Sequence, residues 1–298
     1  MENFILTIAF LLIGIVLRRL PQFPKETAQV LNLFVIYVSL PALVLLKVPE
    51  LTFSRDILSP VIMPWVMLLV SAGIILLAAR LYHWPQETTG ALLLLVPLGN
   101  TSFLGIPMVR AFFDEVGIPY AVLYDQLGSF LALATYGTVV LALYGSGSRP
   151  RLALIVKKVI TFPPFLALVL AVICRDVRLP APAASLLDSL AVTLVPVVMI
   201  AVGYQLTPRL RPEMMSPLLI GLSIKLIVAP LLALAICRFL GIDTLAVRVA
   251  IFEAGMPPMV SAGALAIMAG LAPELTAAMV GIGTLLSFLT LPLLFQLL

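Results

Sequence analysis

Charged residues are scarce in this sequence. They make up 11% of its 298 residues, whereas hydrophobic residues make up 62% and the mean hydropathy is +1.18. An average soluble domain is about 25% charged and about 45–50% apolar. Apolar runs of around 20 residues recur from end to end, and each can cross a hydrocarbon core of about 30 Å. This composition excludes a soluble domain and predicts an all-α polytopic membrane protein.

Histidine and cysteine are almost absent too, which narrows the possible chemistry. The single histidine, His83, stands beside Trp84 at the end of an apolar run, a pattern typical of an interfacial anchor. An intramembrane serine protease needs a histidine buried within the membrane, and this sequence has no histidine inside an apolar run. Cys174 and Cys237 are far apart, so we interpret them as buried free thiols rather than metal ligands.

Catalytic motifs are missing as well. The sequence has no Gly-x-x-x-x-Gly-Lys-Ser/Thr loop, which excludes an ATP-driven step in this chain. Tyr124-Asp125 resembles half of an intramembrane aspartyl protease, but the partner Gly-x-Gly-Asp motif is absent and one carboxylate makes no acid–base pair. We therefore expect no enzyme activity, no metal and no cofactor; H⁺ or Na⁺ remain as coupling ions.

The net charge of +4 does not indicate a nucleic-acid partner. The basic residues are scattered at the ends of apolar runs, where lipid headgroups and membrane topology explain them. Glu2 precedes the first run, and Arg18 and Arg19 follow it, which is the reverse of a cleaved signal peptide. This asymmetry predicts an integral membrane protein whose N-terminus lies outside and whose first loop lies inside.

The apolar runs predict ten transmembrane helices, so the C-terminus should also lie outside. The expected spans are roughly 3–20, 27–47, 57–80, 87–113, 117–144, 157–174, 183–206, 216–239, 244–270 and 273–296.

The second half of the chain resembles the first at an offset of about 155 residues. For example, "PLGNTSFLG" (97–105) aligns with "EAGMPPMVS" (253–261). Five spans per half is an odd number, so the second half must enter the membrane upside down. The sequence thus predicts two inverted five-helix repeats, residues 1–144 and 157–298, joined by a cytoplasmic linker at 145–156.

Two of the predicted spans contain residues that interrupt helices. The fourth span carries "GNTSFLGIP" and the ninth carries "AGMPPMVSAG". Proline donates no backbone hydrogen bond and crowds the preceding turn, while glycine permits unusual backbone angles. Non-helical backbone at membrane depth is tolerated only where it is buried in protein or faces a watery cavity. Matching interruptions in two halves predict a substrate site near the midplane.

Broken helices suit an anionic substrate, because the N-terminal ends of half-helices carry unpaired N–H groups and partial positive charge. Neutral side chains beside the interruptions would orient such an anion. The candidate substrate-binding residues are Asn100, Thr101, Ser102, Gly105, Pro107, Met256, Pro257, Pro258 and Ser261. The alternative is a pair of purely structural proline kinks.

The interrupted segments resemble motifs of the auxin efflux carrier family. "GNTSFLGIP" is similar to the family's Gly-Asn-Thr-Gly-Phe-Leu-Gly run followed by proline, and "MPPMVS" is similar to its Met-Pro-Pro-Ala-Val-Asn run. "KLIVAP" (225–230) also resembles the family's eighth span. Two positions depart from the family pattern, since Ser102 replaces a glycine and Ser261 stands where asparagine is common.

The resemblance implies a fold similar to sodium/proton antiporters and bile-acid symporters, in which helices 4 and 9 cross at their breaks. It implies a scaffold from helices 1, 2, 6 and 7 and a transport domain from helices 3–5 and 8–10. Bacterial members are taken to move organic anions such as malate or malonate, and plant members move auxin. Family relatives also suggest a homodimer and a location in a bacterial inner (plasma) membrane.

Four ionisable residues fall at membrane depth in predicted spans: Asp125, Asp188, Lys225 and Glu253. A charge at that depth costs at least about 2.5–3.5 kcal/mol, so each is a functional candidate, and Asp125, Lys225 and Glu253 are the candidates for coupling or charge relay. Glu253 has the strongest case because it adjoins the second interruption. For Lys225 and Asp188, the alternative is that the side chain reaches to the membrane interface along its stem. For Asp125, the alternative is a position at the level of the lipid headgroups.

Together these features predict a secondary active transporter that moves a small mono- or dicarboxylate by alternating access. An anion channel is the closest alternative, and a membrane sensor that binds without transport is another.

Overall fold

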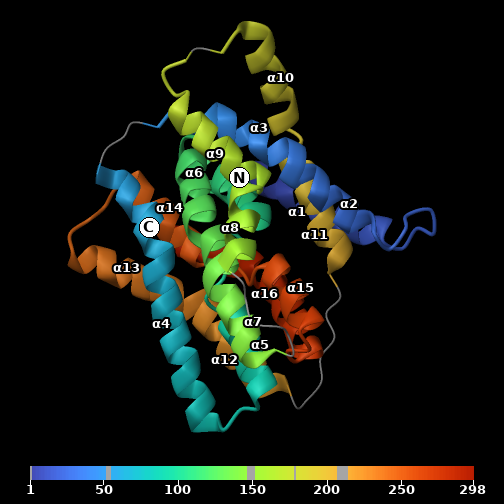
Figure 1. Ribbon diagram of the computed structural model, residues 1–298, viewed down its shortest axis with the longest axis vertical. Coiled ribbons are helices and arrows are strands. Elements are labelled where there is room, and N and C mark those ends of the chain that lie inside the picture. The colour runs from blue at the N-terminus through green and yellow to red at the C-terminus, as the bar shows by residue number, and fades with distance from the viewer. Residues whose placement is uncertain (1, 52–54, 146–151, 178, 207–213) are drawn as a thin grey trace. The chain divides into compact units, whose positions relative to one another are not determined.

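The computed structural model describes residues 2–51, 55–145, 152–177, 179–206 and 214–298 (Figure 1). In these ranges, helices are the only regular secondary structure apart from one isolated β-bridge. The predicted all-helical class is therefore confirmed.

Six of the described helical stretches are long and apolar enough to cross a membrane. They are Thr27–Lys47, Leu58–Tyr82, Thr101–Tyr144, Ala181–Gln205, Met215–Phe239 and Pro273–Phe295. The stretch Thr101–Tyr144 is 44 residues long, but its backbone is non-helical at Asp114. Glu2–Leu17 and Pro163–Ile173 are shorter apolar helices. The chain is thus a polytopic membrane protein.

The chain divides into two compact units. Unit 1 contains Met1–Arg55, Ser102–Val122 and Lys157–Leu206, and unit 2 contains Asp56–Thr101, Leu123–Val156 and Thr207–Leu298. Half of the predicted linker, residues 146–151, lies outside the described residues, and helix α8 (Leu152–Ile160) begins within the predicted linker range.

Unit 1 is built around close packing of its first and last helices. Its elements are α1 (Glu2–Leu17), α2 (Thr27–Phe34), α3 (Leu40–Lys47), most of α6 (Ile106–Leu123), α9 (Pro163–Ile173), α10 (Ala181–Ala191) and α11 (Leu194–Gln205). Helices α1 and α11 meet at glycines: a Cβ on Gly14 would collide with the Ile200 carbonyl, and one on Gly203 with the Leu11 carbonyl. Small residues allow such backbone approach between membrane helices.

Unit 2 holds the larger described core. Its elements are α4 (Leu58–Tyr82), α5 (Gln86–Leu95), α7 (Thr138–Tyr144), α12 (Met215–Ser223), α13 (Ala229–Phe239), α14 (Leu245–Ala254), α15 (Val260–Met268) and α16 (Pro273–Phe295). Helix α5 packs against α7, α15 and α16 (Figure 1). Its residues Leu92, Leu94 and Leu95 are fully buried in a cluster with Ala262 and Met279.

Three prolines each follow a π-helical segment by two residues. Pro41 follows Val35–Ser39, Pro107 follows Thr101–Gly105, and Pro230 follows Ile224–Val228. Proline has no N–H to donate and its ring crowds the carbonyl one turn earlier. A wider π turn relieves both problems without ending the helix. The fourth-span prediction is therefore corrected: residues 101–107 continue a helix, and the interruption lies just before them.

Candidate functional site

The interruption in the fourth predicted span and the one in the ninth are paired with each other in unit 2. Helix α5 ends at Leu95 and helical structure resumes at Thr101, while α14 ends at Ala254 and α15 begins at Val260. Gly99 and Pro258 face one another in an antiparallel β-bridge. The Asn100 N–H donates to the Pro257 carbonyl at 2.8 Å, and the Met259 N–H donates to the Leu98 carbonyl at 3.0 Å. Each interruption therefore supplies hydrogen-bond partners for backbone groups of the other.

The two prolines occupy positions where the bridge needs no N–H. Pro257 contributes only its carbonyl, and Pro258 lies at the non-hydrogen-bonded position opposite Gly99. The Pro-Pro pair prevents α14 from continuing, and neither proline removes a hydrogen bond from the bridge. Opposite it, glycine keeps space free, since a Cβ on Gly99 would lie 3.1 Å from the Lys225 ammonium and 3.5 Å from Met256 Cβ.

Lys225 closes the end of helix α14. It lies on the π-helical segment Ile224–Val228, is 4% exposed, and its Nζ donates to the Ala254 carbonyl at 3.4 Å. Ala254 is the last residue of α14, where carbonyls lack partners within the helix and the dipole is negative. A buried ammonium is favourable there. The alternative that Lys225 reaches to the interface is wrong.

Asp125 takes the complementary place at the start of the resumed helix. The Thr101 hydroxyl donates to Asp125 Oδ1 at 2.5 Å, and Gln126 Nε2 donates to Asp125 Oδ2 at 2.6 Å. Thr101 is the first residue after the interruption, where N–H groups point outward and a negative charge is stabilised. Asp125 and Gln126 lie on a π-helical segment, Tyr124–Phe130, and both are buried.

Glu253 is buried beside these charges. It is 1% exposed, and neither carboxylate oxygen has a hydrogen-bond partner among the described residues. Its charge interacts with those of Asp125 and Lys225. Two carboxylates and one ammonium carry one excess negative charge when all three are ionised. This site thus has an unpaired carboxylate that one bound proton would neutralise.

The predicted site residues fall into three groups. Asn100, Thr101, Met256, Pro257 and Pro258 are buried at the bridge in unit 2, together with Asp125, Lys225 and Glu253. Ser261 is exposed on the first turn of α15. Ser102, Gly105 and Pro107 belong to unit 1. Sequence reasoning missed Gln126, although an amide next to Asp125 within an apolar span was an available signal.

Comparison with known proteins identifies the family. The family model described as "Membrane transport protein" matches residues 1–295. The chain belongs to this family, the auxin efflux carriers.

Two curated relatives match this auxin efflux carrier family member over almost their whole length. One, described as an uncharacterized transporter of Methanothermobacter thermautotrophicus, is 29% identical over 297 residues, covering 98% of this chain and 96% of the relative. The other, an uncharacterized transporter of Methanocaldococcus jannaschii, is 28% identical over 302 residues, covering 98% and 97%. The family is one of membrane transporters, which makes transport the activity that the site has to explain.

The buried charges predict a characteristic pattern of stabilities. Replacing Lys225 with Met leaves Asp125, Glu253 and the end of α14 without their cation. Leaving buried carboxylates without a compensating positive charge costs about 3–5 kcal/mol, which lowers the melting temperature by roughly 5–10 °C. Removing the Glu253 charge as well should restore part of the loss.

Thermal unfolding of purified Lys225→Met, Glu253→Gln and the double variant measures this coupling. Glu87→Gln, an exposed carboxylate on α5, is the matched control and should unfold like the wild type. A double variant that melts no higher than Lys225→Met would show that the two charges do not act on each other.

Proposed function

We propose that this protein is a secondary active transporter that moves a small mono- or dicarboxylate across the plasma membrane by alternating access. The observation that carries the proposal is the antiparallel bridge between two interrupted helices in unit 2. An interruption at membrane depth costs several kcal/mol per unsatisfied backbone group unless protein or a cavity surrounds it. Transporters use such interruptions to build binding sites at the midplane.

The ends of the resumed helices favour an anion. Helical structure restarts at Thr101 and at Val260, so two N-terminal ends with outward N–H groups follow the bridge directly. Asn100 stands between the bridge and the first of these ends, is 2% exposed, and its Nδ2 has no hydrogen-bond partner among the described residues. A buried amide donor without a partner is suited to a carboxylate oxygen, because it offers a hydrogen bond without a fixed positive charge.

A repeated architecture is supported by the positions of the helix ends. Helices α5 and α14 begin at Gln86 and Leu245, end at Leu95 and Ala254, and are followed by helical restarts at Thr101 and Val260. Each pair is separated by 159 residues (245 against 86, 254 against 95, 260 against 101). The bridge partners Gly99 and Pro258 have the same separation, and the antiparallel bridge means that the two segments run in opposite directions. This supports inverted repeats with ten spans.

Under this proposal the helix ends and the buried charges have separate tasks. The N-terminal ends and Asn100 hold the carboxylate. Lys225 and Asp125 compensate the helix ends, and Glu253 takes up a proton when the site faces one side and releases it on the other. The first, second, sixth and seventh of the ten predicted transmembrane spans form the scaffold. The other three spans of each repeat move with the substrate. The proposal also includes a homodimer in which both termini of each chain lie outside the membrane-enclosed compartment.

Loss of the Asn100 amide should weaken carboxylate transport. One neutral hydrogen bond contributes about 1 kcal/mol, so Asn100→Ala should raise the half-saturating carboxylate concentration about fivefold. The measurement is counterflow of radiolabelled malonate and benzoate in proteoliposomes, with Gln296→Ala, an exposed amide of the same unit, as the control. Unchanged saturation would remove Asn100 from the site. Flux without counterflow would indicate a channel, and binding without flux would indicate a sensor.

Neutralising Glu253 should uncouple transport from protons. In wild-type vesicles an imposed pH gradient should drive carboxylate accumulation, whereas Glu253→Gln, which carries no ionisable proton, should exchange carboxylate without accumulating it. Glu87→Gln should accumulate normally. Accumulation by Glu253→Gln equal to that of the wild type would assign coupling to another group, and accumulation driven only by a Na⁺ gradient would contradict proton coupling.

A further inference from the structure

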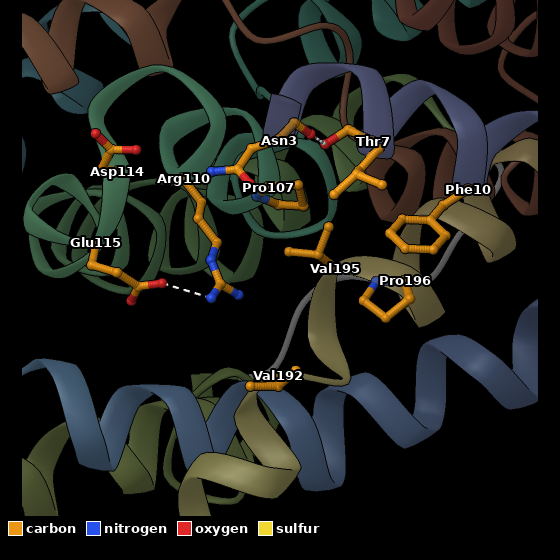
Figure 2. A pocket seen from close by; sticks show the side chains of 11 residues that line it. Asn3, Thr7, Phe10, Pro107, Arg110, Asp114, Glu115, Val192, Val195 and Pro196 are labelled. Carbon is orange, nitrogen blue, oxygen red and sulfur yellow. Dashed lines mark hydrogen bonds and ion pairs between the residues drawn. The ribbon is translucent and has the colours of Figure 1, made fainter. Parts of the chain in front are cut away.

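Unit 1 contains a cavity that the proposed transport site does not use. Its volume is about 330 Å³, and α1, α6 and the Val192–Pro196 segment contribute its walls (Figure 2). Phe10, Pro107, Val195 and Pro196 form apolar parts of the wall, and Arg110 and Glu115 lie together on α6. This volume is at the lower end of the range of about 300–1,000 Å³ that small-molecule sites occupy.

Glu115 is shared between two cations. One carboxylate oxygen accepts from Arg110 Nη2 at 2.7 Å, and the other lies 3.1 Å from Lys47 Nζ. A guanidinium carries five N–H donors in a planar fork that matches a carboxylate. The ion pair with Glu115 uses only part of that capacity. Glu115 can also remain paired with Lys47 if another anion takes its place on Arg110.

A strained backbone creates this arrangement. On a regular helix, residues five apart such as Arg110 and Glu115 point roughly 140° away from each other. They meet because Asp114 between them has φ 57° and ψ −161°, a conformation that is almost confined to glycine and costs about 1–3 kcal/mol. Figure 2 shows Arg110, Asp114 and Glu115 around this kink. Such strain persists where surrounding structure holds it, frequently at binding sites.

We propose that this cavity is a second anion site, which binds a small monocarboxylate with an apolar body. The carboxylate binds Arg110 in place of Glu115, which then stays on Lys47, and the apolar body lies against Phe10, Val195 and Pro196. A dicarboxylate is disfavoured, because its second charge would lie against these apolar groups without a cation. The site goes beyond the proposed transport function, since its residues belong to unit 1 and the bridge belongs to unit 2.

Calorimetric titration of the purified full-length protein with benzoate tests this site. Benzamide, its neutral isostere, and succinate are the ligand controls, and the part of their binding that depends on Arg110 should be at least about tenfold weaker than that of benzoate. Arg110→Gln should weaken benzoate binding by a similar factor. Glu115→Gln should strengthen it, because the competing carboxylate is gone, and such a gain cannot result from misfolding. Lys47→Met should weaken binding, since Glu115 would then remain on Arg110.

The outcomes separate this site from the bridge. Asn100→Ala should leave the Arg110-dependent binding unchanged, so failure of the transport proposal would not affect it. The site is refuted if Arg110→Gln and Glu115→Gln both bind benzoate like the wild type, or if Asn100→Ala abolishes binding while Arg110→Gln preserves it. Absence of benzoate binding to the wild-type protein at millimolar concentration would refute it as well.

Discussion

Two backbone hydrogen bonds pair the interrupted helices of unit 2 with each other. At membrane depth no water replaces a lost backbone partner, so a helix can stop there only if another part of the protein supplies one. In this chain each interruption supplies the other, through Asn100 to Pro257 and Met259 to Leu98. The buried helix ends at the interruptions have charged neighbours. Lys225 lies at the negative end of α14, and Asp125 at the positive end that starts with Thr101. Glu253 remains without a hydrogen-bond partner among the described residues, and the proposed proton coupling rests on this carboxylate.

The sequence predicts much of this because the physical signals are strong. Long apolar runs predict the membrane helices, and Gly99, Pro257 and Pro258 predict the interruptions. The first interruption is predicted too far toward the C-terminus. The segment "GNTSFLGIP" contains several helix-breaking residues, but the π turn before Pro107 lets the helix continue through that proline. The offset of about 155 residues is also four short of the 159 that separates the helix ends. Aligning Gly99 with Gly255 matched residue types, whereas the backbone pairs Gly99 with Pro258.

Other features leave no clear trace in a single sequence. The kink at Asp114 falls where the predicted spans 87–113 and 117–144 leave a gap, but no local signal indicates the positive φ of Asp114 or the pairing of Arg110 with Glu115. The positions of Lys225 and Asp125 at helix ends follow from tertiary structure, since each lies on a different segment from the end that it stabilises. The exposure of Ser261 and the assignment of Ser102 to unit 1 also require coordinates. Local sequence patterns therefore identify the interruptions. Tertiary packing decides which side chains lie beside them.

Disulfide trapping of the bridge tests the pairing of the two interruptions. Residues at a non-hydrogen-bonded antiparallel position lie about 4.5 Å apart between Cα atoms, which suits a disulfide. With the free cysteines Cys174 and Cys237 replaced by serine, Gly99→Cys combined with Pro258→Cys should form a disulfide rapidly under mild oxidation. Gly73→Cys combined with Pro258→Cys should not, because Gly73 is exposed on α4 and a Cβ added there would meet no other atom within 4 Å. Failure of the first pair to cross-link, or equal cross-linking of both pairs, would contradict the paired interruptions on which the transport site rests.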